Sequence, residues 1–282
     1  MQELITKIQS MNLTKTEKLI ADYILDNLNT IGLMTVTDVS LKIGVSDTSV
    51  IRFIRALGYG GFADFKRAMN ERMVEQYNSN LSPMQKYTNT KDKLDENSVV
   101  KNVFFNAMEL LSEATLTVDD RLVNKIADAI IASSNKYVIG FRGTACCADY
   151  FYRKALHFVP HLVLCDKAES NTMEKLIDLS DQDCIIMFSF PRYSEINFSI
   201  LQLAKARGSK IIVITDRVTS PLAAYADYLI TTNVNSVGFT NSYVVPLCFA
   251  EALSVLIGQK TREGSAQRMA DLDTYIYQNQ LY

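Results

Sequence analysis

Apolar residues recur at helical spacing along the amino-terminal part of the chain. Three runs show this spacing: Ile20, Tyr23, Ile24 and Leu28; Val36, Val39 and Ile43; and Val50, Phe53, Ile54 and Leu57. Because each run places its apolar side chains on one face of a helix, the pattern predicts three amphipathic helices. The opposite face of each helix is polar and is expected to meet solvent.

Residues with capping chemistry mark the ends of these helices. Capping boxes are predicted at Thr14 with Glu17 and at Thr35 with Asp38, Gly44 suits a left-handed helix end, and Ser46 can cap the next helix. The last helix is expected from about Asp47 to Leu57, and the Asp47 carboxylate favours the positive end of its dipole. Two short helices joined by a tight turn are typical of a helix-turn-helix DNA reader.

The third helix leaves a polar face for contacts. The candidate DNA-binding residues are Thr48, Ser49, Arg52 and Arg55 on this helix, with Lys66 and Arg67 for the flanking phosphate backbone. In a recognition helix, the first residues and the long donors one turn later reach the major groove. The pattern alone fits an ordinary three-helix unit equally well, because residues 1–77 hold nine Lys and Arg against nine Asp and Glu.

From residue 136 onwards, short apolar runs alternate with helical segments. The runs span 137–141, 162–165, 184–190, 210–215 and 228–231. Continuous apolar strands that alternate with helices indicate a parallel sheet covered on both faces. We therefore expect an α/β three-layer sandwich with a five-stranded parallel sheet, preceded by an all-α amino-terminal domain.

The stretch 78–98 is polar and poor in aliphatic residues, which is typical of a linker. The predicted organisation is a helix-turn-helix domain over 1–77, a linker over 78–98 and a second domain over 99–282. A chain of 282 residues is long enough for two such domains.

Hydroxyl groups and arginines cluster where strands of the predicted sheet end. The candidate ligand-binding residues are Arg142, Gly143 and Thr144 after the first strand, and Ser189, Arg192 and Ser194 after the third. Ligands of open α/β sheets bind at the carboxyl ends of the strands, where helix amino termini favour anions. The alternative is that Thr144, Ser194 and Ser220 serve only as helix caps, a position that serine and threonine prefer in any case. Arginines beside two of them favour an anion site.

These residues carry a resemblance to a known family. The runs LTKTEKLIADYIL and VSDTSVIRFIRALGYGGFADFK resemble the amino-terminal domain of the RpiR (MurR/RpiR) family of bacterial transcription regulators, over roughly residues 1–77. The runs LAKARGSKIIVITD and SPLAAYADYLI resemble the SIS (sugar isomerase) domain, over roughly residues 121–260. The resemblance implies a sequence-specific regulator of sugar or amino-sugar metabolism that binds double-stranded operator DNA. It also implies a phosphosugar or other anionic effector, and a homodimer or a dimer of dimers.

Two loops depart from the family pattern. The family's Gly-x-Gly-x-Ser loop has Arg142 in place of the second glycine and Thr144 in place of the serine. In the family's Ser-x-Ser-Gly-x-Thr loop, Pro191, Arg192 and Ser194 replace the last three named residues. Proline removes a hydroxyl and an amide donor. We therefore expect an altered phosphate cradle in which arginine holds the anion. A different anion and a closed pocket are the alternatives.

The alternative function is a sugar-phosphate isomerase with an accessory helical domain. Its general base would be Glu195, Glu251, His157 or His161. Glu195 more simply favours a helix dipole, and the two histidines lie at a helix-to-strand connection. Because no nucleophile–base pair stands out in the sequence, we expect no catalytic residues and a protein that is not an enzyme.

The composition of the chain argues against several other classes of protein. The net charge of −2 gives no general attraction to nucleic acid or membrane, and the hydrophobic content of 48% supports full-sized cores. No apolar stretch reads as a signal peptide or a membrane span, so we expect a cytoplasmic protein without a membrane partner. The five cysteines form no C-x-x-C pair and the two histidines complete no zinc motif, so we expect no metal and no cofactor.

Overall fold

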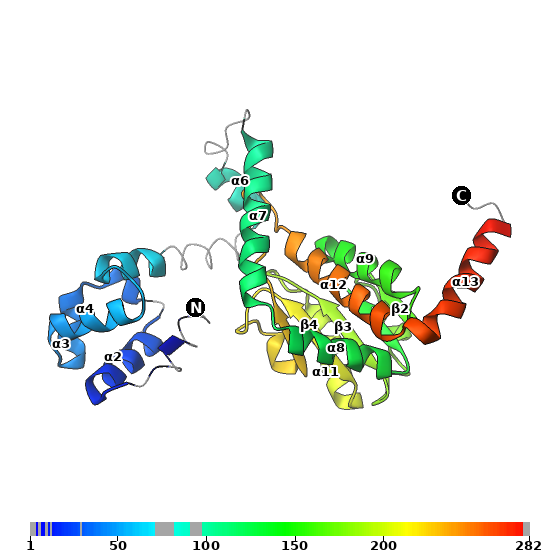
Figure 1. Cartoon of the computed structure of the whole chain (residues 1–282), viewed down its shortest axis with the longest axis horizontal. Helices are drawn as coiled ribbons and strands as arrows, with labels where there is room; N and C mark the ends of the chain where they lie inside the picture. The colour runs from blue at the N-terminus through cyan, green and yellow to red at the C-terminus, as the bar shows by residue number, and fades with distance from the viewer. Residues whose placement is uncertain are drawn as a thin grey trace. The chain divides into compact units, whose positions relative to one another are not determined.

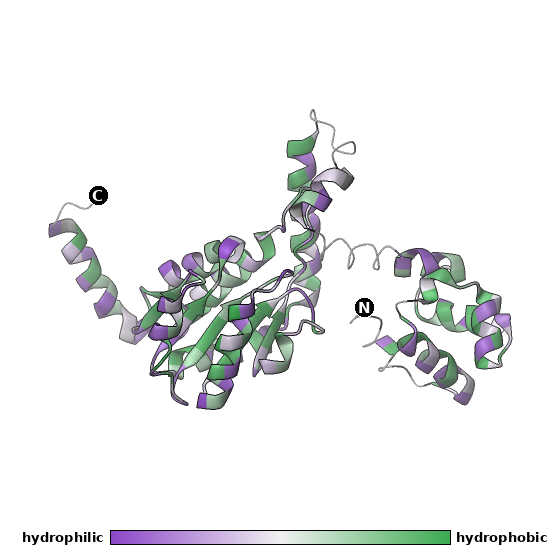
Figure 2. Cartoon of the chain, turned by 180° about the vertical axis from the view of Figure 1, so that it is seen from behind, coloured by the Kyte–Doolittle hydropathy of each residue, from purple (hydrophilic) through white to green (hydrophobic). Residues whose placement is uncertain are grey.

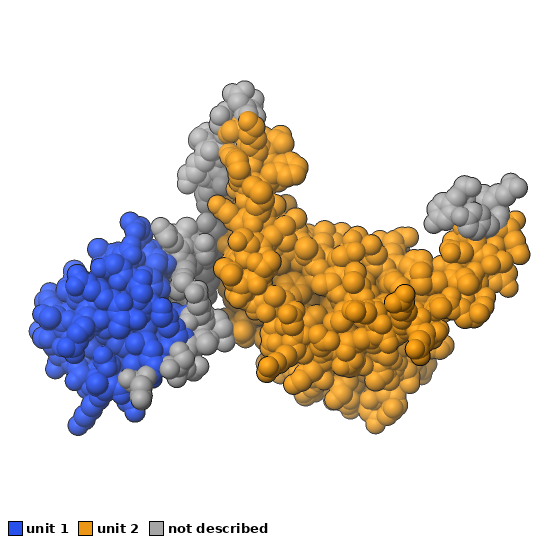
Figure 3. Space-filling model, viewed as in Figure 1, with its two compact units in different colours: residues 1–81 blue, residues 82–282 orange. Residues whose placement is uncertain are grey.

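The computed structural model describes residues 4, 7–8, 11, 13–28, 30–70, 82–90 and 98–278. The chain divides into two compact units, Met1–Leu81 and Ser82–Tyr282, which are coloured separately in Figure 3. Each unit encloses its own apolar core, so each forms a folded body in its own right.

The helices of the first unit pack around large apolar side chains. They are α2 (Lys15–Asp26), the short 3-10 helix η1 (Ile31–Leu33), α3 (Val36–Ile43) and α4 (Asp47–Ala56), and residues 62–70 are also helical. Ile20 and Ile24 of α2 are fully buried together with Phe53 and Ile54 of α4 and with Phe65. The three amphipathic helices predicted from the apolar spacing are therefore confirmed.

The ends of these helices form as the sequence predicts. Both capping boxes are present, at Thr14 and at Thr35. Gly44 ends α3 in the left-handed conformation with φ of 80°, which a residue without a Cβ adopts freely. The Ser46 hydroxyl accepts a hydrogen bond from the third amide of the following helix and so caps α4. Local chemistry therefore sets the turn between α3 and α4.

Five parallel strands form the sheet of the second unit, in the order β2-β1-β3-β4-β5 (Figure 1). They are β1 (Lys136–Ile139), β2 (Leu162–Cys165), β3 (Cys184–Phe188), β4 (Lys210–Thr215) and β5 (Tyr228–Thr231). In register, Ile139 at the end of β1 lies opposite both Cys165 of β2 and Met187 of β3. The strand order reverses between β1 and β3, which is where open α/β sheets bind ligands.

Helices cover both faces of this sheet. The first face carries α8 (Asp120–Ala132), α9 (Ala145–Ala155) and α12 (Val244–Lys260), and the second carries α10 (Ser170–Lys175) and α11 (Glu195–Arg207). Successive strand residues alternate between the two cores, with Val138 in the first and Ile139 in the second. Because both faces are buried, the strands are mostly hydrophobic, apart from polar residues at their ends (Figure 2). The predicted three-layer sandwich is confirmed.

Three further helices belong to the second unit. They are α6 (Pro83–Thr90), α7 (Val99–Thr117) and α13 (Arg262–Gln278). Helix α6 lies inside the stretch predicted as a linker, of which 78–81 and 91–97 lie outside the described residues. Within the described part of the chain, no single helix has the length and apolar composition to cross a membrane. Helices α12 and α13 meet both conditions only as a pair, across a bend of 103°.

Candidate functional site

The carboxylate of Asp47, the first residue of α4, joins α4 to α3. Its Oδ2 accepts a hydrogen bond from the Thr37 hydroxyl at 2.8 Å, and its Oδ1 accepts one from the Ser40 hydroxyl. These two bonds, with Ser40 first, favour the ionised form and hold the pKa of Asp47 below its usual value. The sequence indicated only a dipole role for Asp47, because its partners face it only once the turn has formed. The two helices are therefore held at one angle.

The outward face of α4 brings three of the predicted DNA contacts together. Thr48 and Arg52 are exposed and lie one turn apart, and Ser49 is half-buried beside them. Ser49 donates its amide to the Ser46 hydroxyl at 3.2 Å, and the two hydroxyls lie 2.9 Å apart. The opposite face of the helix is anchored by the fully buried Phe53. A fixed scaffold therefore presents this turn to solvent.

Of the other three predicted DNA contacts, the two arginines are tied to neighbouring groups. Arg55 is exposed, and its Nε donates to the Gly60 carbonyl at 3.4 Å. Arg67 is exposed and forms an ion pair with Asp64, and Lys66 is half-buried. A guanidinium retains further donors when one is engaged, so these side chains suit phosphate contacts better than base contacts.

The loop after β1 is closed by Thr144. Its hydroxyl accepts from the Phe141 amide and donates to the Phe141 carbonyl, both at 2.9 Å, and the side chain is buried. The prediction that Thr144 caps the next helix is wrong, since its side chain makes no capping hydrogen bond to α9. The hydroxyl is engaged with Phe141 across the 3-10 turn η2 (Arg142–Thr144), so Thr144 shapes the loop.

The loop after β3 holds one engaged and one open hydroxyl. Ser189 is buried, and its hydroxyl accepts a hydrogen bond from the side-chain Nδ2 of Asn197 at 2.7 Å. Ser194 stands at the cap position of α11, but the predicted side-chain cap is wrong, because no capping hydrogen bond forms. Within the described part of the chain the Ser194 hydroxyl makes no hydrogen bond, and the residue is half-buried, which leaves the hydroxyl accessible to a ligand. Glu195 follows as the exposed first residue of α11.

Arg142 and Arg192 share a left-handed backbone conformation, with φ of 56° and 67°. A non-glycine residue in this region costs about 1–3 kcal/mol, a cost that glycine avoids. Both side chains are exposed, at the carboxyl ends of β1 and β3. The two loops therefore keep a backbone suited to glycine while each carries a guanidinium.

Lys86 of α6 brings a third basic group to these loops. Its Nζ donates to Oδ1 of Asn241 at 3.3 Å. Burial, and then the nearby charge of Arg192, lower the pKa of Lys86 from its usual value. The two basic groups therefore lie near each other. Sequence reasoning missed Lys86, because it lies in a polar stretch far from Arg192 along the chain and no local pattern marks it.

Tyr243 stands between the two loops. The centroid of its ring lies 5.8 Å from that of Phe190, and its hydroxyl lies 2.7 Å from where a Cβ on Gly143 would be. Burial raises the pKa of Tyr243, so the phenol stays neutral and keeps its donor. Gly143 is therefore needed at its position by Tyr243, a reason that the sequence did not reveal.

The polar groups of the loop after β4 are engaged in a network that includes Tyr193 from the loop after β3. The Tyr193 hydroxyl donates to Oδ1 of Asp216 at 2.5 Å, and Nε of Arg217 lies 3.5 Å from Oδ2 of Asp216. Burial and the hydrogen bond to Asp216 raise the pKa of Tyr193 to about 12. The Ser220 hydroxyl accepts from the Thr215 hydroxyl at 3.2 Å. An anion is therefore better placed at the ends of β1 and β3 than at this loop.

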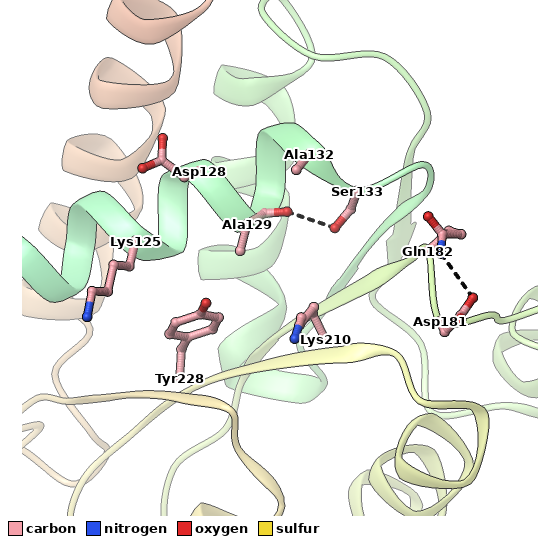
Figure 4. A pocket seen from close by; sticks show the side chains of 9 residues that line it. All are labelled: Lys125, Asp128, Ala129, Ala132, Ser133, Asp181, Gln182, Lys210 and Tyr228. Carbon is pink, nitrogen blue, oxygen red and sulfur yellow. Dashed lines mark hydrogen bonds between the residues drawn. The ribbon is translucent and has the colours of Figure 1, made fainter.

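A hollow of about 420 Å³ lies at the opposite, amino-terminal edge of the sheet (Figure 4). Lys125 and Asp128 line it from α8, while Lys210 and Tyr228 line it from the first residues of β4 and β5. Asp128 is paired with Lys260 at 2.8 Å. Both charge signs occur on its wall, and the strand carboxyl ends lie at the other edge. The hollow therefore lacks both the single charge sign and the strand carboxyl ends that an anion site in an open α/β sheet uses.

Glu251, one of the candidate isomerase bases, is engaged by side chains of α9. Glu251 of α12 accepts from the Tyr150 hydroxyl at 2.7 Å and pairs with Lys154 at 3.2 Å, both on α9. Hydrogen bonds from Tyr150 and Lys154 lower the pKa of Glu251, whereas a general base near neutral pH needs a raised one. His157 and His161 lie between α9 and β2, which places them at the amino-terminal edge of the sheet.

Sequence models of two families match the chain. The helix-turn-helix domain of the rpiR family matches residues 2–76, and the SIS domain matches residues 129–256. The HTH-type transcriptional regulator HexR of Escherichia coli (strain K12) is 25% identical over 234 residues, which cover 82% of this chain and 78% of that protein. The similarity to HexR therefore extends across both units.

Solved structures share the fold. The sugar isomerase domain of an RpiR transcription factor from Sphaerobacter thermophilus superposes with a TM-score of 0.60 at 21% identity, covering 63% of this chain and 99% of that chain. The Vibrio vulnificus NanR protein, complexed with ManNAc-6P, superposes with a TM-score of 0.56 at 16% identity, covering 97% of this chain and 98% of that chain. At these identities the superpositions establish a common architecture.

Proposed function

We propose, from the premise that this chain belongs to the rpiR family of helix-turn-helix regulators with a SIS domain, that it is a transcriptional regulator whose DNA affinity responds to an anionic sugar. The observation that carries the proposal is the exposed first turn of α4, where Thr48, Ser49 and Arg52 stand on a helix fixed by Asp47. Such a regulator must act where its DNA is, so the proposed location is the cytoplasm.

The DNA contacts divide by chemistry. Thr48 and Ser49 are short donors and acceptors at the start of α4, suited to base edges or nearby phosphates. Arg52 has the reach and the forked donors to read guanine. Arg55, Lys66 and Arg67 are proposed to supply sequence-independent contacts to the phosphate backbone. Selection of duplexes by the full-length chain from a random pool, followed by fluorescence anisotropy, tests this assignment. A chain that enriches no sequence contradicts it.

The effector site lies at the ends of β1 and β3. Arg142 and Arg192 supply guanidinium groups, and the open Ser194 hydroxyl adds a donor and an acceptor. The backbone of Gly143 can approach a ligand closely, and Thr144 and Ser189 hold the loops that carry these groups. A phosphosugar is the proposed ligand, since a guanidinium group can bind phosphate through two parallel hydrogen bonds. N-acetylmannosamine 6-phosphate, which NanR holds, is one probe of this site.

The proposed role of this site is sensing without catalysis. An aldose–ketose isomerase needs a base close to the substrate carbon, whereas Glu251 is held in an ion pair with Lys154. Incubation of the protein with hexose 6-phosphates and analysis by NMR tests this directly. Turnover that Glu251→Gln abolishes would establish an isomerase instead.

Regulation follows from a shift between two populations. A ligand that binds one arrangement of the chain more tightly favours that arrangement, and DNA affinity changes by the same coupling free energy. The test is an anisotropy titration of the selected duplex with and without N-acetylmannosamine 6-phosphate and related sugar phosphates. The proposal requires that at least one of them changes the DNA affinity.

The protein is proposed to act as a homodimer, with a dimer of dimers as the alternative assembly. Two copies of α4 would then read the two halves of a palindromic operator. Helix α7 offers an apolar face in the second unit: Val100, Val103, Phe104 and Met108 are all exposed. Large exposed apolar side chains at helical spacing mark an interaction surface, and a second copy of this helix is the proposed occupant.

A further inference from the structure

Helix α6 is docked on the segment that precedes α12. The ring of Tyr87 meets that of Phe239 edge-on, with centroids 4.9 Å apart. One residue earlier, Nζ of Lys86 donates to Oδ1 of Asn241 at 3.3 Å. Two consecutive side chains of α6 thus contact the segment 239–241, which is far from α6 in the sequence.

The segment 239–241 is followed by a residue that contacts the loops after β1 and β3. Tyr243 follows Asn241 by two residues, and it contacts Phe190 after β3 while its hydroxyl lies over Gly143 after β1. Movement of this segment therefore changes the space between both loops. Helix α6 is coupled by contact to the proposed effector site, although its sequence belongs to the stretch between the two domains.

The attachment of α6 is modest. Its Met84 side chain is 70% exposed and Tyr87 is 43% exposed, so little apolar surface is buried by docking. The Asn241 contact holds Lys86 two residues from Tyr243, which packs on Phe190 in the loop that carries Arg192, and the charge of Arg192 helps to lower the pKa of Lys86. An anion between the two basic groups would attract both of them and stabilise the docked helix.

We propose that α6 is a ligand-dependent clasp, in which Lys86 and Arg192 bind the same anionic group and hold α6 against the segment 239–243. The first unit ends at Leu81, and α6 begins at Pro83. The clasp therefore fixes the point at which the chain enters the second unit. This inference rests on the proposed function, since it names Lys86 as a further residue of the effector site and α6 as the element that reports binding.

Hydrogen–deuterium exchange of the full-length protein tests the clasp. The probes are glucose 6-phosphate, N-acetylmannosamine 6-phosphate and inorganic phosphate, with glucose as the uncharged control. A bound anion is expected to slow exchange both in the loops 140–144 and 189–194 and in residues 83–90. Protection by a sugar phosphate but not by inorganic phosphate identifies a sugar ester as the ligand class. Protection by inorganic phosphate alone identifies a free-phosphate site that uses the same clasp.

Two variants separate the clasp from the effector site. Lys86→Gln is expected to weaken binding of the protective probe about tenfold and to abolish the protection of residues 83–90 at saturation. Lys125→Gln, which removes an equal charge at the opposite edge of the sheet, is expected to change neither. Protection confined to the two loops, with Lys86→Gln equal to the unmodified chain, overturns the clasp but leaves the effector site intact. Failure of every anion to bind overturns both.

Discussion

The Tyr243 hydroxyl occupies the space that a side chain on Gly143 would enter, 2.7 Å from the position of its Cβ. Real Cβ atoms do not approach other atoms so closely, so any larger residue at 143 must displace the phenol. Because Tyr243 also contacts Phe190 after β3, the displacement affects the loop after β3 as well as the loop after β1. The spacing of the two loops thus depends on the smallest residue in one of them.

Gly143→Ala is therefore expected to weaken binding of a sugar phosphate at least about tenfold while leaving the sheet folded. Isothermal titration with the probe that protects the loops measures the loss. Gly264→Ala is the matched control, because a Cβ at Gly264 meets no atom within 4 Å. Equal affinities for the two variants would show that Tyr243 does not shape the site.

Arg192→Gly is expected to move stability and ligand affinity in opposite directions. Glycine relieves left-handed strain of about 1–3 kcal/mol, less about 0.5–1 kcal/mol for its greater freedom in the unfolded chain, so a gain of about 1 kcal/mol is expected. The anion loses a guanidinium, and its affinity falls. Urea unfolding and ligand titration measure the two effects. Arg142→Gly should behave alike, whereas Arg207→Gly, at a helix end with ordinary backbone geometry, should gain no stability.

Arg52→Ala and Arg67→Ala are expected to change DNA binding in different ways. Loss of a base-reading arginine costs about 1–3 kcal/mol on the selected duplex and relaxes preference at one base pair. Loss of a phosphate contact weakens all duplexes alike and reduces the salt slope by about 1. Anisotropy titrations on selected and scrambled duplexes across a salt series separate the two. A uniform loss for Arg52→Ala would remove it from the base-reading set.

Asp47→Ala is expected to loosen α3 against α4 and weaken DNA binding. Hydrogen exchange in residues 36–56, corrected for intrinsic rates, should rise relative to the unmodified chain. The Asp47 pKa is lowered on folding, so the ionised carboxylate contributes stability above the usual aspartate pKa of about 3.9 and loses it as pH falls through the lowered value. The difference in stability between the Asp47→Ala variant and the unmodified chain should therefore vanish in acid. Asp22→Ala, exposed on α2, is the control.

Phe104→Glu is expected to dissociate the proposed dimer. The Phe104 side chain is 68% exposed in one copy of the chain, and burying a phenylalanine contributes about 1.5–3 kcal/mol to association. A charge at this position should weaken association at least about tenfold. Analytical ultracentrifugation over a concentration series measures it. Glu109→Lys alters charge at an exposed position on the same helix, turned well away from Phe104, and should have little effect. An unchanged mass for Phe104→Glu would place the interface elsewhere.

The elements fixed by local chemistry were predictable from the sequence. Apolar spacing predicted the buried face of α4, and hydroxyl–carboxylate pairs predicted the caps at Thr14 and Thr35, because each pattern acts within one turn of helix. Continuous apolar runs predicted the parallel sheet, since both of its faces are buried. These inferences needed no knowledge of the tertiary structure.

The inferences that failed required contacts between distant segments. Thr144 and Ser194 stand where caps are expected, yet the first bonds backwards to Phe141 and the second makes no cap. Lys86 lies in a stretch with the composition of a linker, and only the folded unit brings it to Arg192. Serine, threonine and lysine tolerate many surroundings, so their identity alone did not reveal their partners.

The pairing of Asp47 with α3 has a consequence for the approach of a duplex. A carboxylate next to Thr48 would repel phosphates if it turned towards the groove, and one such repulsion offsets one favourable contact. Because hydroxyls of the preceding helix engage both of its oxygens, the negative charge is kept on the side of the protein. The bonds that set the helix angle thereby lower an electrostatic barrier to docking on nucleic acid.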